Sequence, residues 1–455
     1  MKVNPLIFRE YDIRGRVDVD LTEEVAEAIG KAYGTMIRRR RNGKKVVCGR
    51  DGRLSGPKLQ EALIRGILST GVSVMDIGVT PTPVMYFSLF TVEGLDGGIQ
   101  VTGSHNPPEF NGFKICVGQE TIYGPDIQEL RKLIEAEDFE TGKGEKETLD
   151  ILPKYKAFLK ENIHLKRPLK VALDCGNGVT ALTAPDAFKA HGCEVIALYC
   201  EVDGTFPHHF PDPVVEENLA DLRKTVVEQG AEFGVGYDGD GDRIGVVDDK
   251  GNILWGDQLL IIFAREILKE HPGATIIGEV KCSQVMYDEI ARLGGRPIMW
   301  KTGHSLIKKK MKEEKALLAG EMSGHIFFAD RYFGFDDAVY ASLRLAEIVS
   351  ASDVPLSEML KDLPKMVSTP EIRIECPDEK KFEIVRRLTE RLKAMGYKVI
   401  DIDGARVVFE DGWGLVRASN TQPVLVLRFE ARDEKRLEEI RRLIEGLLEE
   451  VKKEV

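Results

Sequence analysis

The chain contains 455 residues, of which 43% are hydrophobic and 31% are charged. This size and composition predict several hydrophobic cores and about three or four domains. The formal net charge of −11 gives no broad basic surface for nucleic acid, and no apolar run is long enough to cross a bilayer. Because residues Met1 to Pro5 also lack the apolar core of a signal peptide, we expect a cytoplasmic protein that binds neither nucleic acid nor membrane.

Cysteines, charge composition and basic runs each have a simple interpretation. The seven cysteines include no CxxC pair, which is typical of reduced, mostly buried thiols rather than a zinc site or a disulfide framework. Abundant Lys, Glu and Arg with few Asn and Gln indicate a thermophilic source. The runs Arg38 to Arg41 and Lys308 to Lys310 fall on or at the ends of amphipathic helices, so we interpret both as solvated faces.

One order of elements occurs three times along most of the chain. Each copy has a buried strand that enters a glycine-containing turn and a helix, then a second strand, then a third strand that leads into a loop of polar, reactive residues. The first strands with their turns lie at 45–52, 170–178 and 274–279, the second strands at 73–77, 194–199 and 297–300, and the third strands with their loops at 99–107, 233–243 and 317–325. This repetition predicts three related α/β domains with mixed sheets, whose loops converge on a central cleft.

The pattern changes from Glu371 onward. We predict a strand there, a helix at 380–395, strands at 399–402, 405–410, 414–417 and 424–430, and a final helix whose apolar stripe of Leu437, Ile440, Ile444, Leu447 and Val451 packs in a core. This is a smaller C-terminal α+β domain. The predicted domains are therefore 1–150, 151–252, 253–367 and 368–455.

The four loops carry residues suited to chemistry, starting with Thr102 to Pro108. There Ser104 follows a glycine at a strand end and has an imidazole beside it, with Lys114 a few residues on. Such a serine is an activated nucleophile or a phosphate carrier, and a Ser/Asn turn before proline is an equally common alternative.

The second loop, Asp238 to Arg243, is the most informative stretch of the sequence. Three carboxylates, Asp238, Asp240 and Asp242, alternate with glycines after a short buried strand. In a locally extended segment these side chains point the same way, and oxygen-only ligation suits Mg²⁺ rather than zinc. The segment lacks the spacing of an EF-hand, and the acids would repel the pyrophosphate of a dinucleotide. An aspartyl-phosphate site of the haloacid dehalogenase type stays open as an alternative, since it also uses Asp-x-Asp.

The remaining two loops have polar groups that suit a sugar phosphate. Gly320 to His325 offers a carboxylate, a hydroxyl and an imidazole, a mixture expected for gripping sugar hydroxyls. Arg417 to Pro423 combines a guanidinium with two hydroxyls and loop amides, which suits a phosphate.

Taken in this order, the four loops resemble those of the α-D-phosphohexomutase family, and specifically its phosphomannomutase/phosphoglucomutase branch. The resemblance extends over essentially the whole chain and includes the opening segment Phe8 to Gly15. It implies a phosphoserine at Ser104, and Mg²⁺ held by Ser104 with Asp238, Asp240 and Asp242. It also implies a sugar loop with Glu321, Ser323 and His325, and a phosphate loop with Arg417, Ser419, Asn420 and Thr421. Catalytic or binding roles are implied as well for Tyr11, Arg14, His105, Lys114, Arg243, Lys281 and His304.

The resemblance also implies a reaction. Phospho-Ser104 donates its phosphoryl group to a hexose 1-phosphate or 6-phosphate, the resulting hexose 1,6-bisphosphate turns over, and its other phosphate returns to the serine. The fourth domain is expected to close over the cleft. Lys114, Arg14 and His325 stay open as candidates for proton transfer.

Three other functions are weighed against this one. Met322 stands where the phosphoglucosamine branch has Gln, and that branch has a Ser-Gly-Thr-Glu phosphate loop, so the sequence favours mannose and glucose over glucosamine. A metal-dependent sugar phosphatase would need no grip on the distal phosphate. A catalytically silent sugar-phosphate sensor would not need Ser104, Lys114 and the three aspartates. The oligomeric state is left open.

Overall fold

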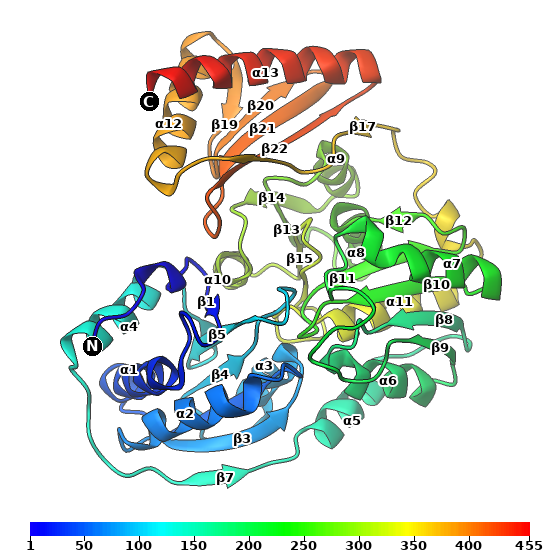
Figure 1. The fold of residues 1–455 in the computed structure, drawn as a ribbon. Helices are drawn as coiled ribbons and strands as arrows, with labels where there is room; N and C mark the ends of the chain where they lie inside the picture. The colour runs from blue at the N-terminus through cyan, green and yellow to red at the C-terminus, as the bar shows by residue number, and fades with distance from the viewer.

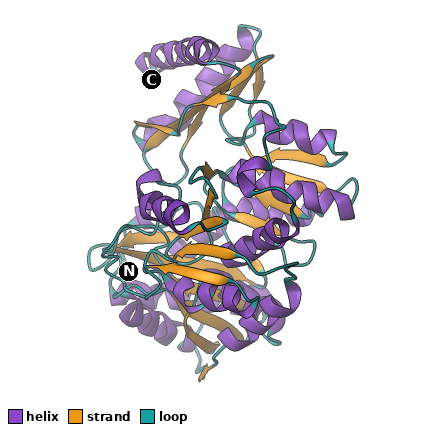
Figure 2. Cartoon of the chain, turned by 90° about the vertical axis from the view of Figure 1, so that its right-hand side faces the viewer, coloured by secondary structure: helices purple, strands orange, loops and turns teal.

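Four sheets, each covered by helices, follow one another along the chain in the computed structural model, which describes residues 1–455 (Figure 1). We call the regions that carry them domains I to IV. Figure 2 shows the sheets of the lower part sandwiched between helices, with domain IV above them at the top. No helix is both long and apolar enough to span a membrane.

Domain I contains a seven-stranded sheet of order β1-β5-β4-β2-β3-β7, with β6 paired to β5. Its elements are η1 (Pro5–Ile7), β1 (Ile13–Arg16), α1 (Glu23–Arg41), β2 (Lys45–Arg50), α2 (Gly56–Leu68), β3 (Ser73–Val79), α3 (Thr82–Thr91), β4 (Gly97–Val101), β5 (Phe110–Val117), β6 (Glu120–Thr121), α4 (Pro125–Ala136) and β7 (Lys146–Thr148). Local signals set the helix ends: the hydroxyl of Thr22 accepts from the amide of Val25 and begins α1, and Asn42 ends it in the left-handed region.

Domains II and III have smaller mixed sheets, of order β12-β11-β10-β8-β9 and β14-β13-β15-β16. Domain II consists of α5 (Leu152–Asn162), β8 (Lys170–Asp174), η2 (Val179–Leu182), α6 (Ala184–Ala190), β9 (Glu194–Leu198), η3 (Glu216–Leu219), α7 (Ala220–Gln229), β10 (Phe233–Tyr237), β11 (Ile244–Asp248) and β12 (Ile253–Leu254). Domain III consists of α8 (Gly256–Glu270), β13 (Thr275–Glu279), α9 (Gln284–Arg292), β14 (Arg296–Trp300), α10 (His304–Glu314), β15 (Leu318–Gly320), β16 (Ile326–Phe328), α11 (Ala338–Ala351) and η4 (Leu356–Glu358).

The three sheets share one topology, which confirms the predicted repeat. In each, the first strand lies between the second and the third, all three parallel, and a fourth strand returns antiparallel to the third: β3-β2-β4-β5, β9-β8-β10-β11 and β14-β13-β15-β16. The domains are not independent bodies, because one hydrophobic cluster of 54 buried residues joins α3 of domain I to the cores of domains II and III.

Domain IV has an antiparallel sheet of order β17-β22-β21-β20-β19, with β18 also paired to β22. Its elements are β17 (Val367–Ser368), β18 (Ile372–Glu375), α12 (Asp378–Ala394), β19 (Lys398–Ile400), β20 (Ala405–Phe409), β21 (Gly412–Ala418), β22 (Val424–Ala431) and α13 (Glu434–Glu454). The predicted C-terminal α+β domain is thus present. It has a core cluster of its own, with 18 buried residues.

Two predictions about single side chains have different outcomes. Six of the seven cysteines are buried, which agrees with the prediction of mostly buried thiols. The predicted stripe of α13 is wrong at one position, because Leu448 is buried and Leu447 lies half-buried at the margin of the core. At 3.6 residues per turn, the step from Ile444 to Leu448 stays on the buried face, whereas Leu447 falls to one side of it.

This difference gives a matched pair of substitutions. Leu448→Ala leaves a cavity under α13 and should lower the local free energy of unfolding of domain IV by ~2–5 kcal/mol, the usual cost for a fully buried leucine. Leu447→Ala should cost clearly less, because part of that side chain is already solvated. Hydrogen exchange of the α12 and α13 amides measures both effects, and equal losses for the two variants would contradict the assignment.

Candidate active site

The predicted functional loops occupy one topological position in their domains. Ser104 lies between β4 and β5, Asp238 to Arg243 between β10 and β11, and Glu321 to His325 between β15 and β16. Each is the connection from the third strand to the antiparallel fourth. In domain IV, Arg417 lies near the end of β21 and the phosphate loop connects β21 to β22. Because ligands of open α/β sheets bind beyond the carboxyl ends of the parallel strands, this repeated position brings the first three loops together.

The three aspartates converge through a turn, and the expectation of an extended segment is wrong. Gly241 has φ of 79°, and the backbone amides of Gly241, Asp242 and Arg243 donate to Asp238 Oδ1 at 3.0–3.1 Å. A residue with a side chain is strained at that φ, which explains the glycine. The carboxylates of Asp238, Asp240 and Asp242 each bring an oxygen within 4.8 Å of the others.

The carboxylate cluster fits a hard divalent cation. All three aspartates are fully buried, and Oδ1 of Asp240 and Oδ1 of Asp242 have no hydrogen-bond partner. Buried oxygens without partners are costly, and an oxygen-only set is what Mg²⁺ prefers. Burial and the charges of the other two aspartates raise the pKa of Asp238. The sole lysine in contact, Lys114 of β5, donates to Asp240 at 2.7 Å and also pairs with Asp242.

Ser104 is held next to this cluster. Its Oγ donates to Asp238 Oδ2 at 3.1 Å and lies 3.2 Å from His105 Nδ1. Burial and the nearby Arg243 and Arg14 hold the pKa of His105 well below its usual range, so its imidazole is neutral beside the hydroxyl. The backbone of Ser104 has φ of 54°, a region that residues other than glycine seldom adopt. Such a conformation persists only where the surroundings impose it.

Arg53 and Asp51, which the sequence analysis did not identify as functional, impose that conformation. The guanidinium of Arg53 donates to the carbonyls of Ser104, Asn106, Pro107 and Phe110 at 2.6–3.0 Å, and the residue is 1% exposed. Asp51 Oδ2 accepts from the hydroxyl of Thr102 at 2.7 Å. A Cβ on Gly103 would lie 2.4 Å from the Arg53 guanidinium, so the loop wraps tightly around it. The available signal was an Asp-Gly-Arg turn at the carboxyl end of β2, the same sheet edge as Ser104.

Two further contacts complete this side of the site. Thr82, also missed, donates its hydroxyl to Asp240 Oδ2 at 2.5 Å. Arg14 of β1 donates to Asn106 Oδ1 at 2.7 Å and pairs with Asp12. Both contacts reach the Ser104 and aspartate loops from other parts of the chain.

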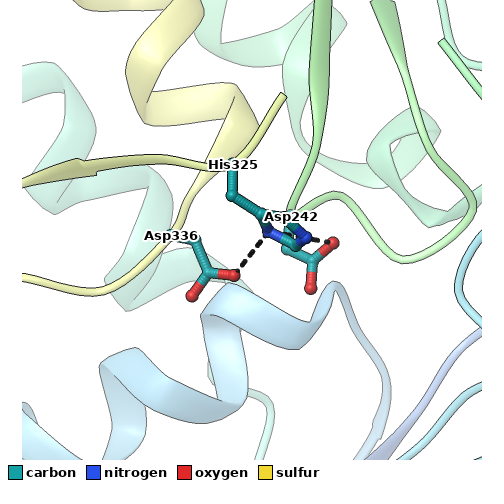
Figure 3. A group of neighbouring side chains, drawn as sticks. All are labelled: Asp242, His325 and Asp336. Atoms are coloured by element: carbon teal, nitrogen blue, oxygen red, sulfur yellow. Dashed lines mark hydrogen bonds and ion pairs between the residues drawn. The ribbon is translucent and has the colours of Figure 1, made fainter. Parts of the chain in front are cut away.

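His325 links the aspartate loop to the sugar loop (Figure 3). Arg243 Nε donates to His325 Nε2 at 3.1 Å, and His325 Nδ1 lies 2.8 Å from Asp336 Oδ2. Its ring stacks on the ring of His304, with centroids 5.5 Å apart. Successive contacts therefore connect Arg243, which follows the three aspartates, through His325 to His304.

Tyr11 extends these contacts to domain IV. The edge of its ring faces His304, and its hydroxyl donates to the carbonyl of Thr302 at 2.5 Å and accepts from Asn420 Nδ2 at 2.7 Å. Glu321 Oε1 accepts from the amide of Gly303 at 2.6 Å, and burial raises the pKa of Glu321. Ser323 is half-buried in the same loop.

Lys281 and Arg417 lie in a second charged group between domains III and IV. Lys281 pairs with Glu371 at 3.1 Å, and Arg417 pairs with Asp403 at 3.1 Å. Ser419 Oγ accepts from the amides of Thr421 and Gln422 at 3.3 and 3.2 Å, which closes the phosphate loop as a turn. A cavity of about 460 Å³ adjoins this region, and Tyr123, Trp300, Asp403 and Asn420 are among its lining residues. Contacts through His325, His304 and Tyr11 connect this region to the aspartates, so residues of all four domains form one continuous set of contacts.

This four-domain architecture is that of the phosphohexomutases. A crystal structure of a phosphoglucomutase/phosphomannomutase family protein from Burkholderia thailandensis superposes with a TM-score of 0.94 at 45% identity, over 99% of this chain and 98% of that one. The chain belongs to the phosphoglucomutase/phosphomannomutase family: it matches alpha/beta/alpha domain I at residues 5–141, domain II at 153–251, domain III at 255–367 and the C-terminal domain at 371–446.

Curated relatives agree with this assignment. A protein named phosphomannomutase/phosphoglucomutase from Pseudomonas aeruginosa is 49% identical over 445 residues, which is 98% of this chain and 96% of the relative. A phosphoglucomutase from Neisseria meningitidis is 45% identical over 447 residues, 97% of this chain and 96% of the relative. These matches support the sequence-based resemblance to the family.

Arg53→Lys tests whether the buried guanidinium organises the Ser104 loop. A lysine keeps the charge but cannot donate to four carbonyls in a fork, so mutase turnover should fall about 100-fold, the typical cost of a small misplacement of a reacting group. Steady-state assays with a hexose 1-phosphate measure this.

The control is Arg50→Lys, because Arg50 ends β2 just before the turn that carries Arg53 but bonds Gln60 instead of the Ser104 loop. Its turnover should stay near that of the unchanged protein. A similar loss in both variants would assign the effect to the turn as a whole and not to Arg53.

Proposed function

We propose that this protein is a phosphomannomutase/phosphoglucomutase. It interconverts the 1- and 6-phosphates of mannose and glucose through phospho-Ser104 and a hexose 1,6-bisphosphate, which serves as intermediate and activator. The observation that carries the proposal is the position of Ser104: its buried Oγ lies 3.1 Å from Asp238 in the carboxylate cluster, where domains I and II meet. The names of the relatives support the same substrates.

Ser104 carries the phosphoryl group in this mechanism. The phosphoserine P–O bond breaks as the free hydroxyl of the sugar attacks phosphorus, which leaves Ser104 with a free hydroxyl. In the second transfer this hydroxyl attacks the other phosphoryl group of the bisphosphate, so that Ser104 is phosphorylated again and the isomeric monophosphate is released. His105 beside Oγ is neutral, so it adds no charge of its own there. The tight Arg53 support keeps the serine in one orientation for both transfers, which is the positioning that phosphoryl transfer requires.

Asp238, Asp240, Asp242 and Ser104 would hold Mg²⁺. A bound Mg²⁺ supplies positive charge that offsets the charge of the transferring group. Arg243 and Lys114 carry the protein's own positive charges at this place. Without a cation, Lys114 is the group that offsets Asp240 and Asp242, and these carboxylates raise the pKa of Lys114 against the opposing effect of burial.

The other loops bind the sugar and the phosphate that is not reacting. Glu321, Ser323 and His325 bind the sugar, and Arg417, Ser419, Asn420 and Thr421 hold the distal phosphate. Tyr11, Lys281 and His304 are further substrate-binding residues. A mutase needs this second grip because its intermediate must remain bound while it turns over. A sugar phosphatase does not need it, so the grip favours the mutase. Met322 in the sugar loop favours the same branch over a phosphoglucosamine mutase.

Domain IV closes over the bound sugar in this proposal. Its separate core allows it to move as a unit, whereas domains I to III share a hydrophobic cluster. Closure brings Asn420 and Arg417 onto the phosphate and excludes water, which would otherwise accept the phosphoryl group. Lys114, Arg14 and His325 remain the candidates for moving the proton of the attacking hydroxyl.

Ser104→Ala should abolish turnover and leave the fold intact, because the only proposed carrier of the phosphoryl group is lost. The unchanged protein should carry a partial phosphate on Ser104, which intact-mass and peptide mass spectrometry detect. Phosphate on Asp238 instead would support the aspartyl-phosphate alternative.

Asp240→Asn should weaken the dependence on Mg²⁺ and lower activity together. The substitution removes one of three buried charges that repel one another when no cation is present. Titration of activity with Mg²⁺ after treatment with a chelator measures the effect. Full activity of the unchanged protein in excess chelator is the result that would exclude the metal role.

The sugar loop predicts which hexoses react. The 3- and 4-hydroxyls exchange places when the sugar turns over, so Glu321 and Ser323 can grip them in both orientations. Glucose 1-phosphate and mannose 1-phosphate should therefore react with comparable efficiency. Galactose 1-phosphate, inverted at position 4, should lose one charge-assisted hydrogen bond, which costs ~2 kcal/mol or roughly thirtyfold in rate.

Side-by-side assays should also include glucosamine 1-phosphate. Equal rates on glucose and galactose phosphates would show that Glu321 does not select the 4-hydroxyl. The best rate on glucosamine 1-phosphate would assign the chain to the alternative mutase, and release of inorganic phosphate without isomerisation would indicate a phosphatase.

A further inference from the structure

Asp336 has no role in the mechanism above, yet it contacts a residue of the proposed site. It lies between β16 and α11, is fully buried, and reaches His325 across the sugar loop. We propose that Asp336 is a positioning residue that fixes the ring orientation and the Nδ1–H tautomer of His325. The proposal deepens the proposed function, because it defines which nitrogen His325 presents to the phosphoryl-transfer centre.

The two neighbours of the imidazole determine where its proton sits. Arg243 Nε is only a donor, and it lies 3.1 Å from His325 Nε2, so Nε2 must offer its lone pair. The ring proton then sits on Nδ1, which donates to Asp336 Oδ2 at 2.8 Å. In the opposite tautomer, the Nε2–H of His325 would face the Nε–H donor of Arg243. The lone pair on Nδ1 would then face the carboxylate of Asp336. Only one tautomer satisfies both contacts.

Asp336 is itself held from two sides, so its carboxylate stays in place. Its backbone forms a β-bridge with Phe327 of β16, and its Oδ1 pairs with Lys308 Nζ at 3.1 Å. Lys308 Nζ also lies 4.0 Å from the centroid of the Tyr86 ring in domain I. The prediction of a solvated face is therefore wrong for Lys308, whose side chain is only 12% exposed. It belongs to a buried chain that runs from Lys308 through Asp336 and His325 to Arg243.

The ring faces of His325 are also covered. His304 stacks at 5.5 Å between centroids, and Phe327 lies 6.2 Å away at a similar tilt. Because Asp336 contacts the Nδ1 edge of the ring, the Nε2 edge is the one that remains, and it faces Arg243. His325 therefore presents an unprotonated nitrogen to the centre, whichever of the candidate groups moves the substrate proton.

A metal site at the same three side chains is the competing interpretation. Asp242, His325 and Asp336 bring one potential ligand atom each within 4.8 Å of the others (Figure 3). However, Lys308 pairs with Asp336, and the Arg243 guanidinium bonds His325. Two of the three potential ligands therefore already have a cationic partner of their own, which would repel a further cation. Positioning is the role that these contacts support.

The test combines spectroscopy with kinetics on the full-length protein. The chain has eight histidines, so ¹⁵N-histidine NMR without substrate can resolve them, and His325→Gln assigns the signal. We expect a protonated Nδ1 and an unprotonated Nε2 for His325. Asp336→Leu should release the fixed tautomer and lower kcat about 10- to 100-fold with KM changed less than about threefold, as for other partners that orient a functional histidine. Asp336→Asn keeps an acceptor oxygen, so it should retain the tautomer and recover part of kcat.

The matched control is Asp330→Asn. Asp330 is a nearby buried aspartate that pairs with Arg344 at 2.7 Å and does not contact His325. In Asp330→Asn, both the NMR signal of His325 and kcat should stay unchanged. The proposal would be overturned by a protonated Nε2 in the unchanged protein, or by an unchanged His325 tautomer in Asp336→Leu. If the leucine variant does not fold, Asp336→Asn decides. A kcat in that variant as low as in His325→Gln would also overturn the proposal. The NMR result does not depend on activity, so it separates this proposal from a failure of the mutase assignment.

Discussion

The site depends on keeping three carboxylates buried next to one another and next to Ser104. Like charges at this distance repel one another, and burial strengthens the repulsion. The protein offsets it from several directions: the turn amides donate to Asp238, Lys114 pairs with Asp240 and Asp242, and Thr82 donates to Asp240. The two remaining oxygens, on Asp240 and Asp242, have no partner within the protein. Two unpartnered carboxylate oxygens of this kind suit a hard divalent cation such as Mg²⁺.

The repeated topology explains how these distant groups meet. In domains I to III the functional loop follows the third strand of the sheet, at the edge where parallel strands end. The shared core of these domains holds the three edges against one another. Domain IV, which has a core of its own, adds its loop through Tyr11 and Asn420. In the proposed function, the joined domains carry the phosphoryl-transfer chemistry and domain IV holds the phosphate that is not reacting.

The sequence predicted the parts of the molecule that have a local signature. Hydrophobic strands and glycine turns gave the repeat, and strand ends followed by polar residues gave the four loops. The remaining features depend on contacts between residues far apart in the chain. Thr82 bonds Asp240 at a separation of 158 residues, and Arg53 acts on carbonyls that any loop possesses. Lys308 belongs to a run of lysines, which is typical of a solvated face. Its side chain is mostly buried because it pairs with Asp336, and the sequence does not reveal that contact. In the aspartate loop, alternating glycines permit both an extended segment and a turn, and the backbone bonds to Asp238 select the turn.

The hydrogen bond between Tyr11 and Asn420 has a consequence for how the protein is made. It joins two residues that are 409 positions apart, one near the start of the chain and one on the hairpin before the final helix. On the ribosome, Tyr11 emerges long before Asn420 is synthesised, and α13, which completes the core beneath that hairpin, follows later still. Until then, the hydroxyl of Tyr11 lacks its Asn420 partner, and the chain lacks the loop that we propose for the distal phosphate. Under the proposed function, an unfinished chain would therefore be unable to retain an intermediate through its turnover.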